Sequence, residues 1–188
     1  MSLKYAVLGV LEAKPMTGYD LKRFLDASAG WLWSAKHSQI YPLLAVMQAD
    51  GLVDGEEGVR GEAQRRVVYR ITDAGLAELE SWIATVHPLP DERDPFLLQS
   101  VFFDMVDDEQ VRPVLVAYRD RQREIHRHAL AHSRALEGGE TPLIRERLVG
   151  RTEGIERMLA MKARAFAARA EVARVRLEWA EEYLAALE

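Results

Sequence analysis

The sequence predicts a mainly α-helical protein with one small β-hairpin, divided into two parts by a proline-rich linker. Apolar residues recur at helical spacing over most of the chain, one short run alternates apolar and polar residues, and three prolines fall within residues 88–95. Proline fixes its own backbone and restricts the residue before it, so we expect a linker at 87–95. The predicted domains are therefore residues 1–86 and 96–188.

The first part is expected to contain three helices, a hairpin and a fourth helix. Apolar residues at helical spacing predict helices at residues 2–13 and 38–50. Between them, Thr17 and Asp20 match the capping pattern that opens a further helix. Thr72 is expected to cap the fourth helix after the hairpin.

The hairpin is predicted from residues 65–71, which follow a tip rich in glycine and charged residues at 55–64. Within that run Val67, Tyr69 and Ile71 alternate with two arginines and a valine, the period-two pattern of a half-buried strand. Three helices, a hairpin and a helix in this order predict a winged helix-turn-helix, a fold that binds duplex DNA.

The second part is expected to be helical throughout. A short helix is predicted at residues 96–102 and a long one at 107–136, which Gly138–Gly139 should end. A last helical region should begin at Thr141–Pro142 and be interrupted near Gly150 and Gly154.

Both long helices carry a heptad pattern, in which seam residues follow one another at alternating steps of four and three. The seam of the first helix consists of Val111, Leu115, Tyr118, Gln122, Ile125, Ala129, His132 and Leu136. The last helix has a similar seam rich in alanine, which permits close approach of a partner helix. Because two such seams exceed what one small domain should cover, we expect a second copy of the chain to contact Phe166, Ala170, Ala173, Leu177, Ala180 and Leu184.

Charge and composition exclude several classes of function. The net charge of −5, with acidic residues in excess on both sides of the linker, means that any DNA binding must come from a local patch. The absence of cysteine excludes disulfides, thiolate metal sites and cysteine catalysis. With no apolar run long enough to span a membrane and no leader pattern at its start, the chain is expected to be cytoplasmic.

The first candidate DNA contacts are hydrogen-bonding side chains at the start of the third helix, namely Lys36, His37, Ser38, Gln39 and Tyr41. The N-terminal end of a recognition helix enters the major groove, where Gln can pair with adenine and Lys can reach guanine or phosphate. An ordinary capped helix with solvated polar residues is the alternative.

The second candidate group is the set of hairpin arginines Arg60, Arg65, Arg66 and Arg70. A basic hairpin beside a helix-turn-helix can lie along the phosphate backbone. Charge that protects an exposed strand edge from pairing with other chains is the alternative, and the two roles are compatible.

No metal, cofactor or catalytic site is expected. His126, His128 and His132 lack the glutamate of an HExxH motif, and the heptad pattern makes His132 a seam residue. No phosphate-loop, GxSxG or GxGxxG pattern occurs, so we expect no enzymatic activity. The aromatic residues are expected to pack in the core, or alternatively to line a pocket for a planar effector at Trp31, Trp33, Phe96, Trp179 and Tyr183.

Four stretches of the sequence resemble the PadR family of bacterial transcriptional regulators. They are LKYAVLGVLEAKPMTGYDL, WSAKHSQIYPLLAVMQADGLV, YRITDAGLAEL and LEWAEEYLAAL. Trp33 and the following HSQIY, together with the chain length, resemble the subgroup with the larger, Vir-type C-terminal helical domain.

The resemblance implies a homodimeric winged-helix regulator, usually a repressor, that binds a near-palindromic operator in double-stranded DNA. It implies that Gln39 and Tyr41 contact DNA, that the arginine-bearing hairpin is the wing and that the terminal helices dimerise. It also implies a response to phenolic acids or other small aromatic effectors. Two alternatives come from the residues themselves: a protein that binds small aromatic or drug-like molecules with a secondary DNA role, and a helical scaffold.

Overall fold

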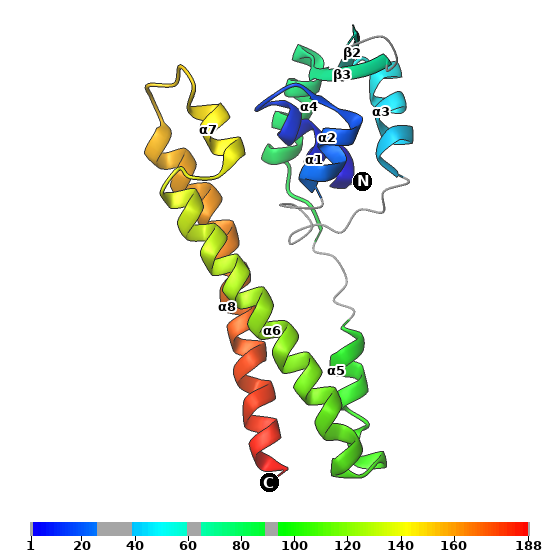
Figure 1. The fold of residues 1–188 in the computed structure, drawn as a ribbon, viewed down its shortest axis with the longest axis vertical. Coiled ribbons are helices and arrows are strands. Elements are labelled where there is room, and N and C mark those ends of the chain that lie inside the picture. Colours follow the sequence, from blue (N-terminus) through cyan, green and yellow to red (C-terminus); the bar gives the residue numbers. More distant parts are fainter. Residues whose placement is uncertain (1, 26–38, 60–64, 89–93, 188) are drawn as a thin grey trace. The chain divides into compact units, whose positions relative to one another are not determined.

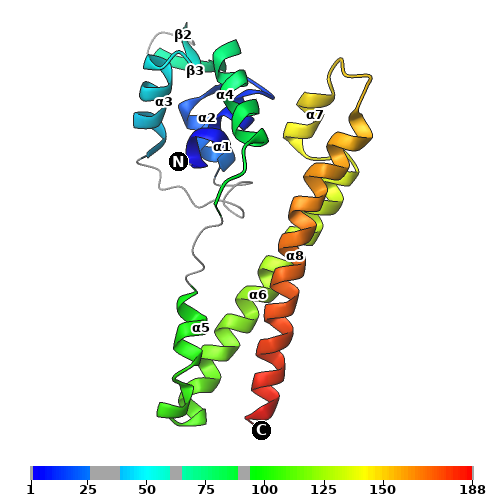
Figure 2. The same ribbon diagram turned by 180° about the vertical axis from the view of Figure 1, so that it is seen from behind.

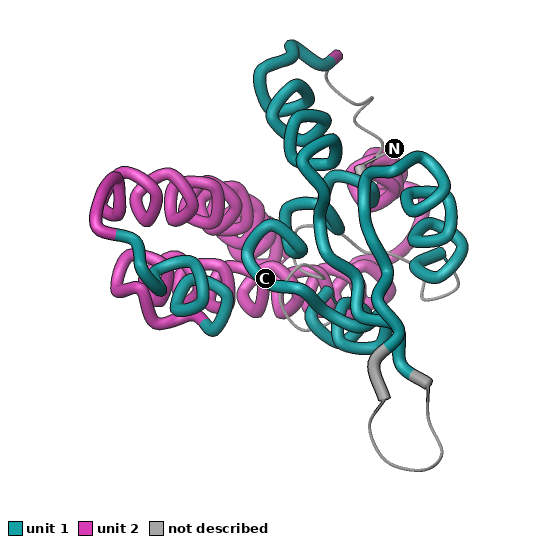
Figure 3. Tube along the Cα trace, turned by 90° about the horizontal axis from the view of Figure 1, so that it is seen from above, with its two compact units in different colours: residues 1–87, 142–151 teal, residues 88–141, 152–188 magenta. Residues whose placement is uncertain are grey.

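The computed structural model describes residues 2–25, 39–59, 65–88 and 94–187. The chain forms two compact units (Figure 3). Unit 1 consists of residues 1–87 and 142–151, and unit 2 of residues 88–141 and 152–188. The fold is mainly helical with one small antiparallel sheet, so the predicted fold class is confirmed.

The helices and strands of unit 1 follow the predicted order, with α7 added from later in the chain (Figure 1). They are α1 (Ser2–Leu11), β1 (Met16–Thr17), α2 (Gly18–Phe24), α3 (Ile40–Ala49), β2 (Val53–Val59), β3 (Arg65–Ile71), α4 (Asp73–Ala84) and α7 (Pro142–Leu148). Those of unit 2 are α5 (Pro95–Ser100), the short 3-10 helix η3 (Phe103–Met105), α6 (Asp108–Glu137) and α8 (Ile155–Ala186).

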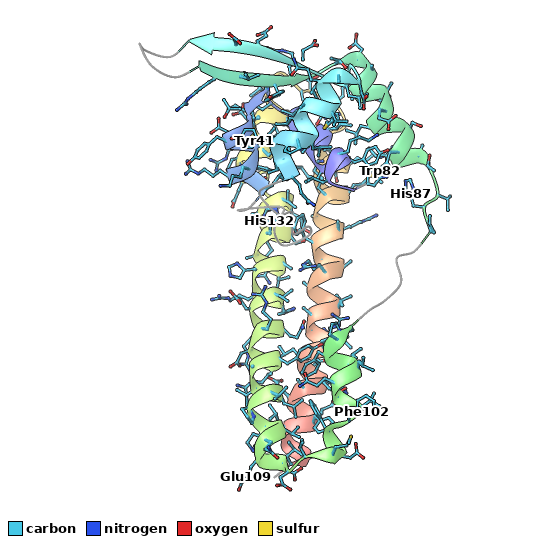
Figure 4. The ribbon with its side chains drawn as sticks, turned by 90° about the vertical axis from the view of Figure 1, so that its right-hand side faces the viewer. Tyr41, Trp82, His87, Phe102, Glu109 and His132 are labelled. Atoms are coloured by element: carbon cyan, nitrogen blue, oxygen red, sulfur yellow. The ribbon has the colours of Figure 1, made fainter. Side chains whose placement is uncertain are left out.

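The core of unit 1 surrounds α1, which buries apolar side chains on several sides. The other buried side chains come from α2, α3, the start of β2 and α4, and the fully buried ones include Val7, Leu8, Leu21, Leu44, Met47 and Val53. Tyr5 of α1 stacks on Trp82 of α4 with ring centroids 4.4 Å apart, and its hydroxyl donates to Glu78 at 3.0 Å. These contacts hold α4, which carries Trp82 (Figure 4), against α1. The buried side chains of α3 belong to the same apolar core.

Both predicted helix caps are present in unit 1. The Thr17 hydroxyl accepts a hydrogen bond from the Asp20 backbone N–H at 3.1 Å, and donates to the Asp20 carboxylate at 2.7 Å. The carboxylate therefore reaches the hydroxyl of the capping residue rather than its backbone. The Thr72 hydroxyl accepts from the Gly75 N–H at 3.0 Å and donates to the Gly51 carbonyl at 2.7 Å, which joins the start of α4 to the end of α3.

The sheet has the strand order β1-β3-β2, with β3 in the centre. β2 and β3 form the predicted hairpin, which extends away from the helices of unit 1 (Figure 3). β1 was not predicted, because two residues give no periodic signal. It pairs Met16 with Tyr69 and Thr17 with Val68, after which the chain turns into α2. The edge of β3 beyond Val68 is therefore left uncovered by β1.

α7 is attached to α1 by polar contacts. The Arg147 side chain, 11% exposed, donates from Nε to Glu12 at 2.7 Å and from Nη2 to the Gly9 carbonyl. Lys14 forms a second ion pair with Glu146. These bonds join residues 142–151 to the rest of unit 1.

In unit 2, α6 and α8 lie side by side and antiparallel (Figures 1 and 2). The Ser133 hydroxyl donates to the Ala163 carbonyl at 3.0 Å, and His126 Nδ1 lies 3.0 Å from the Ala170 carbonyl oxygen. The helices bury the predicted seams against each other, at Val111, Leu115, Gln122, Ala129 and Leu136 of α6 and at Ala163, Ala170, Ala173, Ala180 and Leu184 of α8.

The seam of α8 therefore has a different partner from the one expected. Ala170, Ala173, Ala180 and Leu184 are buried within a single chain, and Phe166 and Leu177 are half-buried. Phe166 packs on His132 of α6 with ring centroids 4.3 Å apart. A heptad pattern shows that a helix face is covered, but it does not distinguish the same chain from a second copy.

The described part of the chain contains neither a metal-binding cluster nor a membrane-spanning helix. Within the described ranges, no three histidine or carboxylate side chains are grouped so that they could hold a metal ion. None of the described helices is long and apolar enough to cross a membrane.

Candidate nucleic-acid interface

The exposed start of α3 carries two of the predicted DNA contacts. Gln39 is the N-cap residue of α3, and its exposed side chain makes no capping hydrogen bond. Tyr41, in the first turn, is 54% exposed and is labelled on α3 in Figure 4. Lys36, His37 and Ser38 lie outside the described residues.

α3 has no charged side chain on any face. Its inner face buries Ile40, Leu44 and Met47, and its outer face exposes Pro42, Ala45, Val46 and Ala49 beside Gln39 and Tyr41. Such a surface can hydrogen-bond base edges through the amide and contact thymine methyl groups through its apolar side chains. It cannot itself attract phosphates by charge, so that attraction has to come from neighbouring elements.

The register of the hairpin separates the arginines of β3. Arg66 and Arg70 are both exposed and lie on the same face of the strand, as the alternation predicts. Arg70 is directly opposite Asp54 of β2, whereas Arg66 is opposite Gly58, which has no side chain. The charge of Arg70 thus faces an acidic neighbour across the strands, while that of Arg66 does not.

The remaining predicted wing contacts are Arg60 and Arg65. Arg65 is the first residue of β3 and pairs with Val59, whereas Arg60 lies outside the described residues. β2 carries the acidic side chains of Asp54, Glu56 and Glu57, of which the last two belong to the charged stretch 55–64 seen in the sequence. The hairpin therefore carries both signs of charge, and its basic character is concentrated on β3.

A cavity of about 510 Å³ lies between β1, the start of α2, α3 and β3. Its lining consists of Thr17, Gly18, Tyr19, Tyr41, Arg66, Val67 and Tyr69. The cavity brings together two predicted DNA contacts, Tyr41 of α3 and Arg66 of the hairpin. It also adds Tyr19, which is 62% exposed and which the sequence analysis placed only in a helix.

Gly18 sets the distance between α2 and α3 at this cavity. A β-carbon at residue 18 would lie 2.7 Å from Cε1 of the Tyr41 ring, well inside ordinary van der Waals contact. The ring of Tyr41 therefore rests directly on the backbone at the start of α2. A glycine is required here because any side chain would displace the tyrosine from the cavity wall.

The described candidate effector residues lie in an aromatic cluster of unit 2. Phe96 packs edge-on against Trp179 with centroids 5.9 Å apart, and Trp179 lies 5.6 Å from Tyr183. Phe96 also stacks on Tyr118 at 3.6 Å. These contacts give the three residues a packing role, whereas Trp31 and Trp33 lie outside the described residues.

Comparison with known proteins finds a similarity to one family. Residues 7–81, which run from the middle of α1 to near the end of α4 and include the hairpin, match the PadR-like family of transcriptional regulators. This match covers less than half of the 188 residues of the chain. The PadR-like match contains every described residue of the candidate interface, and the family is one of regulators rather than enzymes.

Similar curated proteins include the negative transcriptional regulator PadR of Bacillus subtilis, which is 34% identical over 109 residues. That alignment covers 57% of this chain and 60% of the relative, so it spans less than two thirds of the relative's length. The crystal structure of B. subtilis PadR with operator DNA matches with a TM-score of 0.75 and 24% identity, covering 100% of this chain and 98% of that one. Its structure with p-coumaric acid matches with a TM-score of 0.68 and 25% identity, covering 100% and 99%.

Proposed function

We propose that this protein is a sequence-specific DNA-binding transcriptional regulator, acting as a homodimeric repressor on a near-palindromic operator. One observation carries the proposal: Tyr41 of α3 and Arg66 of the hairpin line the same cavity. The recognition helix and the wing therefore belong to one surface, as simultaneous contact with a groove and its phosphates requires. The winged-helix fold and the family support the same function.

On this surface the two elements have different roles. α3 enters the major groove, where Gln39 bonds base edges and Val46, exposed on the outer face, can contact a thymine methyl group. Arg66 supplies the charge that the uncharged α3 lacks and holds a backbone phosphate. Because the whole chain has a net charge of −5, this local charge has to provide the attraction for DNA.

Dimerisation would place two such surfaces on successive half-sites, about 34 Å or a multiple of that distance apart. We assign the contact with the second copy to unit 2, on faces other than the buried seam between α6 and α8. Exposed apolar side chains support this assignment, notably those of Leu98, Val101, Phe102 and Val175.

We further propose that a small aromatic molecule releases the protein from DNA. B. subtilis PadR has been crystallised with p-coumaric acid, and this chain has the same fold. A ligand releases the protein from DNA only if it binds one conformation more tightly than another. The favoured conformation has to be one that cannot contact both half-sites.

Competition binding of Gln39→Ala to operator and random duplexes tests this function, using the DNA upstream of the protein's own gene as the operator. We expect the parent to prefer that DNA, and Gln39→Ala to lose about thirtyfold of this preference, because one base contact is removed in each of the two half-sites. Gln48→Ala is the matched control: Gln48 is on the same helix, but its amide lies against Gly55 of β2. Equal preference of the parent for both duplexes would overturn the proposal.

A further inference from the structure

We propose that the cavity between α2, α3 and β3 is a clamp for one phosphodiester group of the DNA backbone, with Tyr19 and Arg66 as its main contacts. The inference rests on the proposed function and extends it, because it adds Tyr19 and Tyr69 to the DNA-binding surface. It also assigns a role to the start of α2, which the sequence analysis treated only as a capped helix.

The chemistry of the lining is that of an anion site. The cavity has a volume of about 510 Å³, and among the described lining residues Arg66 carries a charge and none is a carboxylate. Within the part of the chain that the structure describes, Arg66 forms no ion pair and the hydroxyls of Tyr19, Tyr41 and Tyr69 form no hydrogen bonds. A guanidinium group and phenolic hydroxyls can all donate to phosphate oxygens.

The carboxylate closest in sequence is already engaged elsewhere. Asp20, which follows Tyr19, accepts the hydroxyl proton of Thr17 at 2.7 Å as part of the α2 cap. Thr17 in turn uses its oxygen to accept from the Asp20 backbone N–H at 3.1 Å. The cap therefore occupies the Thr17 hydroxyl and one oxygen of the Asp20 carboxylate, while the tyrosine hydroxyls and Arg66 stay available in the cavity.

The cavity exists because β1 is short. Its pairing with β3 ends at Thr17 and Val68, and the next residue already belongs to α2. Arg66 and Val67 lie just beyond the last residue of β3 that pairs with β1, so they have β2 on one side and no strand on the other, and both line the cavity. This opening at the strand edge gives the phosphate access to the arginine.

One wall of the clamp is formed by Tyr41. The Tyr41 ring rests on the Gly18 backbone, where there is no room for a side chain. Tyr41 also belongs to α3, so a phosphate held in this cavity would fix the position of the recognition helix in the groove. Such a contact sets the register of the protein on DNA without reading the sequence.

A double-mutant cycle between the protein and the DNA backbone tests the clamp. Single phosphates of the operator are replaced by neutral methylphosphonates, placed symmetrically in both half-sites, and the affinities of the parent and Tyr19→Phe are compared for each duplex. On unmodified DNA, we expect Tyr19→Phe to weaken binding to operator and random duplexes equally, by about a hundredfold, because it removes one hydrogen bond to a charged group in each protomer. Tyr118→Phe, in the aromatic cluster of unit 2, is the matched control and should retain the parental affinity.

The clamp predicts that one methylphosphonate position cancels the effect of Tyr19→Phe, while all other positions leave it unchanged. Additivity at every position, or an affinity of Tyr19→Phe equal to that of the parent, would overturn the clamp. If Gln39→Ala still loses its operator preference in that case, the proposed DNA-binding function stands without the clamp. A parent protein that binds no duplex overturns both.

Discussion

Two glycine substitutions in unit 1 should change its stability in opposite directions. A β-carbon on Gly75 would lie 2.1 Å from the Leu52 carbonyl oxygen, which is backbone and cannot swing aside. Relief requires α4 to move away from the turn after α3, where Thr72 bonds both Gly51 and Gly75. Overpacking of this kind costs about 1–3 kcal/mol, and loss of the cap about 1 kcal/mol more. Gly75→Ala should therefore destabilise unit 1 by about 3 kcal/mol.

Gly9→Ala is the matched control, since Gly9 lies within α1 and a β-carbon there meets nothing within 4 Å. Alanine is favoured over glycine in a helix interior, so this variant should stabilise unit 1 by about 0.5–1 kcal/mol. The free energy of unfolding of unit 1 alone is measured in urea, with hydrogen exchange of the α1 and α4 amides as the signal. Equal changes for the two variants, or a Gly75→Ala protein as stable as the parent, would refute the close packing of α4 on Leu52.

Three further outcomes follow from the polar groups of the helices. Tyr118→Phe should stabilise unit 2 against urea by about 1 kcal/mol, because the Tyr118 hydroxyl is buried with no hydrogen-bond partner among the described residues; a loss of stability would mean that it has one. Burial lowers the pKa of His132 in the folded chain, so the unfolded chain binds the extra proton more readily. Unit 2 should therefore be most stable above the usual histidine pKa of about 6.5 and weaken as the pH falls below it, and His132→Leu should remove this part of the pH dependence. Arg147→Ala should speed hydrogen exchange in α7, since it removes the bonds to Glu12 and Gly9, and unchanged exchange would show that α7 does not depend on them.

Local signals in the sequence predicted most of the elements correctly. Thr17 and Thr72 cap α2 and α4 as expected, because capping depends on residues only three positions apart. The alternation in residues 65–71 also predicted β3 with its correct bounds. β1 escaped prediction because its pairing depends on Tyr69 and Val68, which are distant in sequence.

Features that depend on distant partners were predicted less well. The heptad seams were identified correctly, but the partner of the α8 seam is α6 of the same chain. Arg66 and Arg70 look equivalent in the sequence, and only the strand register reveals Asp54 opposite Arg70. Tyr19 joined the candidate site because tertiary packing brings the start of α2 beside α3 and β3.

The most direct test of whether the hairpin contacts DNA phosphates is the salt dependence of duplex binding. It is measured for the parent, Arg66→Ala and Arg70→Ala. For the parent, the logarithm of the association constant should fall linearly with the logarithm of salt concentration. Arg66→Ala should flatten the slope by about 0.9 for each phosphate that the variant no longer neutralises, and so by about 2 for a dimer. Arg70→Ala, whose charge faces Asp54, should change it by less than half as much. Duplex binding that does not respond to salt, or one slope shared by all three proteins, would contradict the proposed DNA-binding surface.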